Sequence, residues 1–191
     1  MTGDEENLAS HALAASPPAV ERISPDDVAR RLREHGWTGL AAEQAPAEFQ
    51  AWLARAAQLL GPQVSGPEEL SSLLELVFHY DAQEILDSTD AQIVLGRAGA
   101  RSVIRELGRE VLAGSAIDSD RLKEIFDRVR QRTGYGGREL FHPLRLALAG
   151  RAGGGEMDRV ILLLDLGAQL PFAARVKGTR ERMLEFCTRL D

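Results

Sequence analysis

The 191-residue sequence is poor in several residue types, and each shortage excludes a class of protein or site. Its single cysteine, Cys187, excludes an internal disulfide and any all-cysteine metal site. Only Lys123 and Lys177 are lysines among 23 basic residues, which leaves little room for lysine chemistry. The longest apolar run, Val160 to Leu164, has five residues, whereas a membrane-spanning helix needs about 20. The sequence predicts no association with a membrane.

The N-terminal region has little that could direct export or fold. It begins MTGDEENLAS, which is acidic where a secretory signal would be basic, so we expect a cytoplasmic protein. Residues 1–22 contain few large apolar side chains and a Ser16-Pro17-Pro18 break. Such a segment buries too little apolar surface to offset its ordering entropy. We therefore expect residues 1–22 to be a disordered lead-in.

The usual residue sets of enzymes and metal sites are also missing. No two of the four histidines have metal-ligand spacing: His11, His35, His79 and His142. The glycine-rich turns at 134–137 and 153–155 lack the Lys-Ser/Thr that follows a phosphate-binding loop. We therefore predict no bound metal, no cofactor and no catalysis by this chain itself.

Strand-like alternation is absent, and the apolar residues recur at helical spacing along the chain. Ser24-Pro25-Asp26-Asp27 is typical of a helix start, with a serine cap, an early proline and first-turn acids. Further helices are expected at about 46–60, 66–78, 90–113, 119–133, 138–149, 156–166 and 171–190, with a possible break at Gly96 and Gly99. The fold class predicted is all-α, as two packed small helical bundles spanning residues 23–80 and 81–191.

Charge is unevenly distributed along the sequence. Residues 1–119 carry nine basic and nineteen acidic side chains, whereas residues 120–191 carry fourteen and ten. The acidic total, a net charge of −6, argues against indiscriminate nucleic-acid binding and against a DNA-binding role. A chain of this kind can still present one basic face to a phosphate backbone.

The most informative stretch runs from Gly137 to Met157, GRELFHPLRLALAGRAGGGEM. Pro143 is expected early in a helix, where its missing N–H costs nothing and the first turn offers free amides. Arg145 is expected to project away from the buried stripe of that helix. The alternative for Arg145 is an ion pair with a neighbouring acid.

This stretch resembles the C-terminal anticodon-binding domain of bacterial glutamyl-tRNA synthetases. That family shows the signature Gly-x-x-Leu-(Phe/Met)-x-Pro-Leu-Arg-x-Ala-Leu-Thr-Gly-x-x-x-Gly-Pro-Glu-Leu. It is met here by Gly137, Leu140, Phe141, Pro143, Leu144, Arg145, Ala147, Leu148, Gly150, Gly154 and Glu156. The departures are Ala149 for Thr, Gly155 for Pro and Met157 for Leu. Residues 61–78 also resemble the family's first bundle, so the likeness covers about 24–190.

The resemblance implies a helical cage that grips the anticodon loop of tRNA, where unstacked bases are accessible to side chains. Carried over by position, His142 and Arg145 would contact bases or phosphate. Gly154, Gly155 and Met157 would lie in the loop that packs on the anticodon. Gln63 falls where relatives carry Arg or Gln, and it implies relaxed discrimination between glutamate and glutamine tRNA.

A synthetase of this family also has a catalytic domain that binds ATP, with a His-x-Gly-His-like motif and a Lys-Met-Ser-Lys-like loop. Neither motif occurs here, so ATP would bind only to a separate catalytic domain. Three functions remain open from the sequence. The chain could be a tRNA-binding module that acts with a synthetase. It could be a paralogue repurposed as a protein-interaction module, which the changes at Ala149 and Gly155 motivate. It could also be a small enzyme of unknown type.

Overall fold

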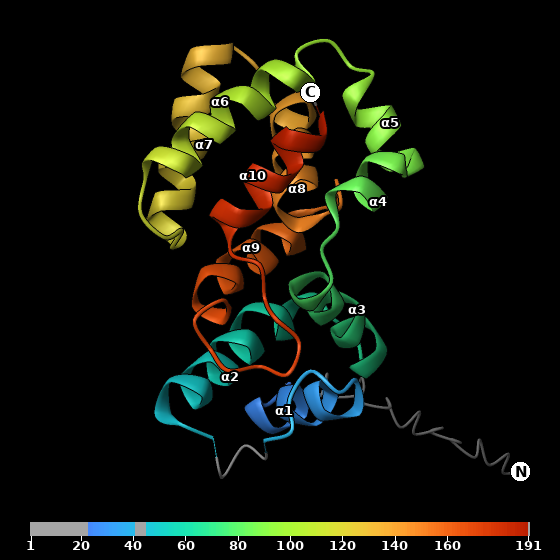
Figure 1. Ribbon diagram of the computed structural model, residues 1–191, viewed down its shortest axis with the longest axis vertical. Helices are drawn as coiled ribbons and strands as arrows, with labels where there is room; N and C mark the ends of the chain where they lie inside the picture. Colours follow the sequence, from blue (N-terminus) through green and yellow to red (C-terminus); the bar gives the residue numbers. More distant parts are fainter. Residues whose placement is uncertain (1–22, 41–44, 191) are drawn as a thin grey trace, which may run out of the picture.

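The computed structural model describes residues 23–40 and 45–190, and all regular structure within those ranges is helical (Figure 1). This confirms the all-α prediction. The predicted lead-in, residues 1–22, lies outside the described residues. None of the helices in the described ranges combines the length and apolar character that crossing a bilayer requires.

The first part of the chain forms three helices and a short 3-10 turn. Their bounds are α1 Pro25–Glu34, α2 Ala47–Leu60, η2 Gly61–Gln63 and α3 Pro67–Phe78. Helix α1 packs against both α2 and α3. Each of these three α-helices begins close to the position that its proline and first-turn acids indicate, because those residues act on the first turn itself.

Helix α1 begins with a capping box formed by Ser24 and Asp27. The Asp27 amide donates to Ser24 Oγ, and the Ser24 amide donates to Asp27 Oδ2 at 2.9 Å. Hydrogen bonds from Ser24 are the main cause of the lowered pKa of Asp27. Two otherwise unpaired amides are satisfied in this way, which stabilises the start of the helix.

We expect Ser24→Ala to lower the free energy of unfolding by about 1 kcal/mol, because both side-chain hydrogen bonds of Ser24 are lost. A carboxyl group with a lowered folded-state pKa stabilises the protein above its unfolded-state pKa and loses that effect as the pH falls. The difference between Ser24→Ala and the parent should therefore shrink on acidification, as urea denaturation would show. Ser72→Ala is the control, since Ser72 is exposed and its hydroxyl bonds only the Glu68 carbonyl. An equal loss in both variants would contradict the role of the cap.

Seven helices make up the rest of the described chain. They are α4 Ala82–Asp87, α5 Thr89–Leu95, α6 Ala100–Ala113, α7 Ser119–Thr133, α8 Gly137–Ala149, α9 Gly155–Gly167 and α10 Thr179–Leu190. Helix α10 contacts α4, α6 and α8, and α6 also packs on α7 (Figure 1). Helix α9 packs on α8 at one side and on α2 and α3 at the other, so one continuous core joins both parts of the chain.

Two local predictions need correction, whereas the possible break at Gly96 and Gly99 is confirmed. The expected helix at 90–113 is interrupted at 96–99, where Gly99 has a φ of +86° that favours glycine. A short helix, α4, precedes it and is capped by Asp81, whose carboxylate accepts from the amides of Gln83 and Glu84. The helix expected at 171–190 begins only at Thr179.

The non-helical segment 171–178 crosses over to the first helices. The Ala173 amide donates to the Trp37 carbonyl at 2.8 Å, and Phe172 packs among the rings of Phe49, Trp52 and Phe78. A helix over 171–178 would remove Phe172 from these aromatic neighbours. Tertiary packing therefore overrides the local helical pattern here.

The fully buried Arg182 ties the two parts of the chain together. Its guanidinium donates to the carbonyls of Val77 at the end of α3 and Leu148 near the end of α8. It also lies over the Tyr80 ring, whose hydroxyl donates to the Ala147 carbonyl. Burial raises the pKa of Tyr80, so this hydroxyl keeps its proton. The position of α8 relative to α3 depends on these contacts.

Candidate functional site

The site predicted from the sequence is built on α8, which begins after a glycine-rich turn. Gly136 precedes the helix without a side-chain cap, and Gly150 ends it with a φ of +82°. Pro143 is the seventh residue of α8 and is buried, not in the first turn as predicted. Pro143 has no N–H, so the carbonyl of Glu139, one turn earlier in the helix, lacks its main-chain hydrogen-bond donor. The open amide end of α8 therefore lies at 137–140.

The side chain of Arg145 points away from the buried face of α8, but it is bonded to other residues of the protein. Its Nε and Nη2 donate to the two carboxylate oxygens of Asp158, each at 2.8 Å, and its Nη1 donates to the Gly153 carbonyl at 3.1 Å. The guanidinium also lies 5.1 Å from the centre of the Phe141 ring. The ion-pair alternative for Arg145 is thus the arrangement observed. Arg145 thus joins α8 to α9 by a bidentate contact with Asp158, and it holds the loop between them by one hydrogen bond to Gly153.

The glycine-rich loop after α8 is held by contacts with the first residues of α9. The Gly154 amide donates to Glu156 Oε1 at 2.8 Å, and a Cβ at Gly154 would meet that carboxylate at 2.6 Å. Space around Gly155 is open. Met157 belongs to α9, not to the loop, and its side chain is buried in the core. Of these three positions, Gly155 alone has open space where a Cβ would lie, although it is the first residue of α9 and not part of the loop, and Met157 offers no free side-chain surface.

His142 lies on α8 beside three arginines. Arg97, which follows α5, places Nη1 3.4 Å from His142 Nδ1. Burial is the main cause of a lowered pKa of His142, and the positive charges of Arg97, Arg138 and Arg145 lower it further. The imidazole is therefore neutral near pH 7. It forms part of a basic face that we define by Arg97, Arg138, His142 and Arg145.

Gln63 lies apart from the basic face. It is exposed in η2, whose first residue, Gly61, packs against Ile23 just before α1. Gln63 precedes the start of α3, whereas Arg182 joins the other end of that helix to the end of α8, and a helix of 12 residues is about 18 Å long. The structure thus brings His142, Arg145 and the loop glycines together and leaves Gln63 in the first bundle.

Sequence reasoning missed Arg97 and gave no role to Arg138. Neither arginine has a carboxylate partner within ion-pair distance among the described residues, unlike Arg145. Arg97 is 45 positions from His142 along the chain. The only local signal for it was the glycine break between α5 and α6, which positions Arg97 at the end of α5. No metal-binding group of three or more His, Cys, Asp or Glu side chains occurs in the described ranges.

The fold and the site define an all-helical domain with a basic face on its Pro-Leu-Arg helix, in which Arg138 is exposed and the other members are half-buried. The sequence pattern of the anticodon binding domain family matches residues 25–167. The chain therefore belongs to the family of anticodon-binding domains.

The relatives are glutamate–tRNA ligases. The chain is 29% identical to the enzyme of Bacillus licheniformis over 146 residues, which is 76% of this chain and 30% of the relative. It is 30% identical to the Bacillus thuringiensis enzyme over 128 residues, covering 66% of this chain and 25% of the relative. The chain thus spans less than a third of the length of these relatives. No solved structure matches it significantly.

Proposed function

We propose that this chain binds the anticodon stem-loop of glutamate tRNA through its basic face, without catalysing a reaction itself. The observation that carries the proposal is the position of Arg138 and His142 on the Pro-Leu-Arg helix, with Arg97 beside them, in a chain that belongs to the anticodon-binding family. Within the described ranges, the guanidinium groups of Arg97 and Arg138 have no carboxylate partner, so they can approach RNA phosphates or base edges.

Arg145 supports this function mainly by shaping the loop. Its contacts with Asp158 and Gly153 hold residues 150–155 against the first turn of α9, next to the open surface at Gly155. Gln63, in the first bundle, would contact a different part of the RNA from the basic face. The acidic side chains elsewhere on the chain disfavour binding to arbitrary nucleic acid.

Catalysis would belong to another polypeptide segment. We propose that ATP binds only to a separate catalytic domain, because the relatives contain a much longer chain than the matched region. A function in tRNA recognition would be carried out in the cytoplasm. If the chain does not bind RNA, the alternative function is that of a repurposed protein-interaction module.

We expect Arg145→Ala to weaken binding of a glutamate tRNA anticodon stem-loop by roughly fivefold to a hundredfold, the range for loss of one base contact or its support. Filter binding with the labelled stem-loop measures this, and a thermal melt shows whether the variant is folded. Arg175→Ala is the control, since Arg175 lies exposed on the 171–178 segment and, among the described residues, pairs only with Glu181 of α10. Undiminished binding by folded Arg145→Ala, or a stem-loop that the parent does not bind at low salt, would refute the proposal.

A further inference from the structure

The contact between Arg97 and His142 determines which nitrogen of the imidazole carries the proton. A guanidinium has only N–H donors, so it cannot accept a hydrogen bond. His142 Nδ1, at 3.4 Å from Arg97 Nη1, must therefore be the acceptor and carry no proton. In a neutral imidazole the remaining proton then lies on Nε2.

The charges around His142 favour the neutral ring. Arg97 faces it from the end of α5, and Arg138 and Arg145 face it from α8 itself. Asp90 on α5 acts on it in the opposite direction, and its effect is smaller than that of each of the three arginines. Desolvation and the three cations outweigh this carboxylate, so the pKa of His142 lies below its ordinary value.

We infer that Arg97 is a positioning residue that holds His142 as the Nε2–H tautomer, so that the site offers RNA a hydrogen-bond donor and no acceptor. Among the described residues, no protein atom accepts from Nε2. The matching group on a base is a carbonyl oxygen or an unprotonated ring nitrogen, and an exocyclic amino group does not fit. A glutamine at this position could instead offer either a donor or an acceptor. The inference rests on the proposed function, because it specifies the chemistry of the same basic face.

Nitrogen-15 NMR of the free protein tests the tautomer without RNA. In the parent at pH 7, we expect an unprotonated Nδ1 and a protonated Nε2 for His142, with the signal assigned by its loss in His142→Gln. In Arg97→Met, the two tautomers should become mixed, because the donor to Nδ1 is gone. Arg138→Met is the matched control, since it removes the same charge beside His142 but no hydrogen bond to it. A protonated Nδ1 in the parent, or an unchanged tautomer in Arg97→Met, would overturn the inference.

RNA binding tests the consequence of that tautomer. The glutamate tRNA stem-loop is titrated into each variant at an ionic strength that screens most of the lost charge. We expect Arg97→Met to bind about fivefold more weakly than Arg138→Met, since only the former disorders the donor. Equal losses in the two variants would overturn the role of Arg97 while leaving the basic face in place. Failure of the parent to bind would instead refute the proposed function, and the NMR result on the free protein would still decide the tautomer.

Discussion

Replacing Arg182 with methionine should lower the free energy of unfolding by about 3 kcal/mol, the largest effect expected of any single substitution considered for this chain. The guanidinium donates to the carbonyls of Val77 at 2.7 Å, Leu148 at 3.0 Å and Lys177 at 2.9 Å. Methionine is long enough to fill much of the space, but it leaves all three carbonyls without this donor. Buried polar groups that lose their partner cost about 1–3 kcal/mol each, and local rearrangement recovers part of that.

Burial of Arg182 also has an unfavourable side, which limits the expected loss. Desolvation lowers its pKa to about 10, so the folded state disfavours the charge that the unfolded chain carries freely. At pH 7 the group is charged in both states, and the three hydrogen bonds and the Tyr80 ring offset the desolvation. Because methionine removes the desolvation cost together with the bonds, the net loss is smaller than the sum of three orphaned carbonyls.

Urea denaturation at pH 7 measures this loss, and Arg175→Met is the matched control. Arg175 has the same side chain but is 79% exposed and pairs only with Glu181, so its replacement should change stability by less than about 0.5 kcal/mol. Arg182→Lys keeps the charge but has a single nitrogen and should lie between the two. If Arg182→Met is as stable as the parent, the guanidinium does not join the parts of the chain.

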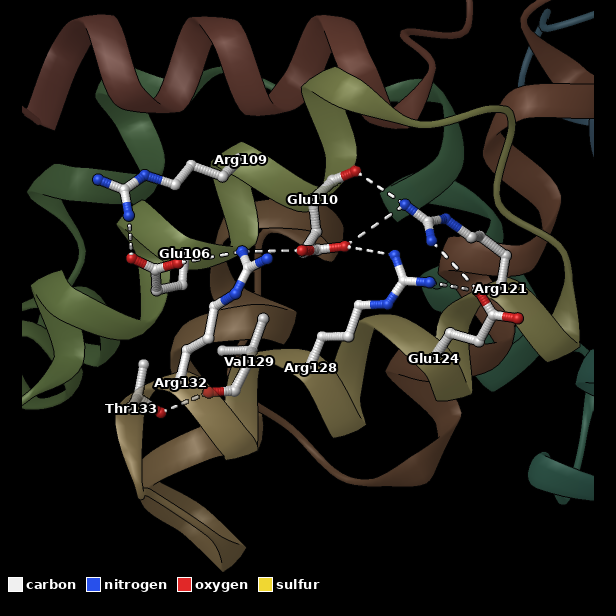
Figure 2. A network of polar contacts seen from close by, with 9 residues as sticks. All are labelled: Glu106, Arg109, Glu110, Arg121, Glu124, Arg128, Val129, Arg132 and Thr133. Carbon is white, nitrogen blue, oxygen red and sulfur yellow. Dashed lines mark hydrogen bonds and ion pairs between the residues drawn. The ribbon is translucent and has the colours of Figure 1, made fainter.

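Glu110→Ala should be the second most damaging substitution, with an expected loss of about 2 kcal/mol. Glu110 lies on α6 with its side chain only 7% exposed, and it faces three arginines from α7 (Figure 2). Its carboxylate is 2.9 Å from Arg132, 3.1 Å from Arg128 and 3.6 Å from Arg121. Removal of the one buried carboxylate leaves these arginines with only their weaker contacts to Glu106 and Glu124.

The expected loss at Glu110 is less than for a fully buried pair, because Arg128 and Arg132 are about half exposed and can turn to water. Arg121 is more enclosed and keeps its bond to the Glu110 main-chain carbonyl and its pair with Glu124. A thermal or urea melt of Glu110→Ala and of Glu124→Ala compares two carboxylates in one network. Glu124 is 55% exposed, so its loss should cost less than about 1 kcal/mol. Equal effects would show that burial of Glu110 does not matter.

Local signals predicted the parts of the fold in which neighbours along the chain decide the structure. Ser24, Pro25 and Asp27 mark the start of α1, because a cap, a proline and a first-turn acid all act within one turn. The glycine break between α5 and α6 was also predicted from the sequence, because it too depends on neighbouring residues. The segment 171–178 was predicted wrongly, because Phe172 leaves a helical pattern for an aromatic cluster on α2 and α3.

The candidate site was only partly visible for a related reason. The pattern around Pro143 and Arg145 indicated the helix and the family, and the family match covers residues 25–167. It did not place Pro143 in the helix interior, and it left open whether Arg145 points to RNA or to an acid. Asp158 is thirteen positions further along, and it meets Arg145 only because the loop turns α9 back onto α8.

The amino-acid sequence by itself determined the helical class, most helix starts and the likeness to anticodon-binding domains, since these depend on composition, spacing and short-range hydrogen bonds. Only the tertiary structure decided that Arg182 bonds the distant carbonyls of Val77 and Leu148, that Arg145 is paired with Asp158 and that Arg97 faces His142. These contacts join residues up to 105 positions apart. Their partners are chosen by how the helices pack, and helix packing depends on the shape of the whole core, which local sequence patterns do not encode.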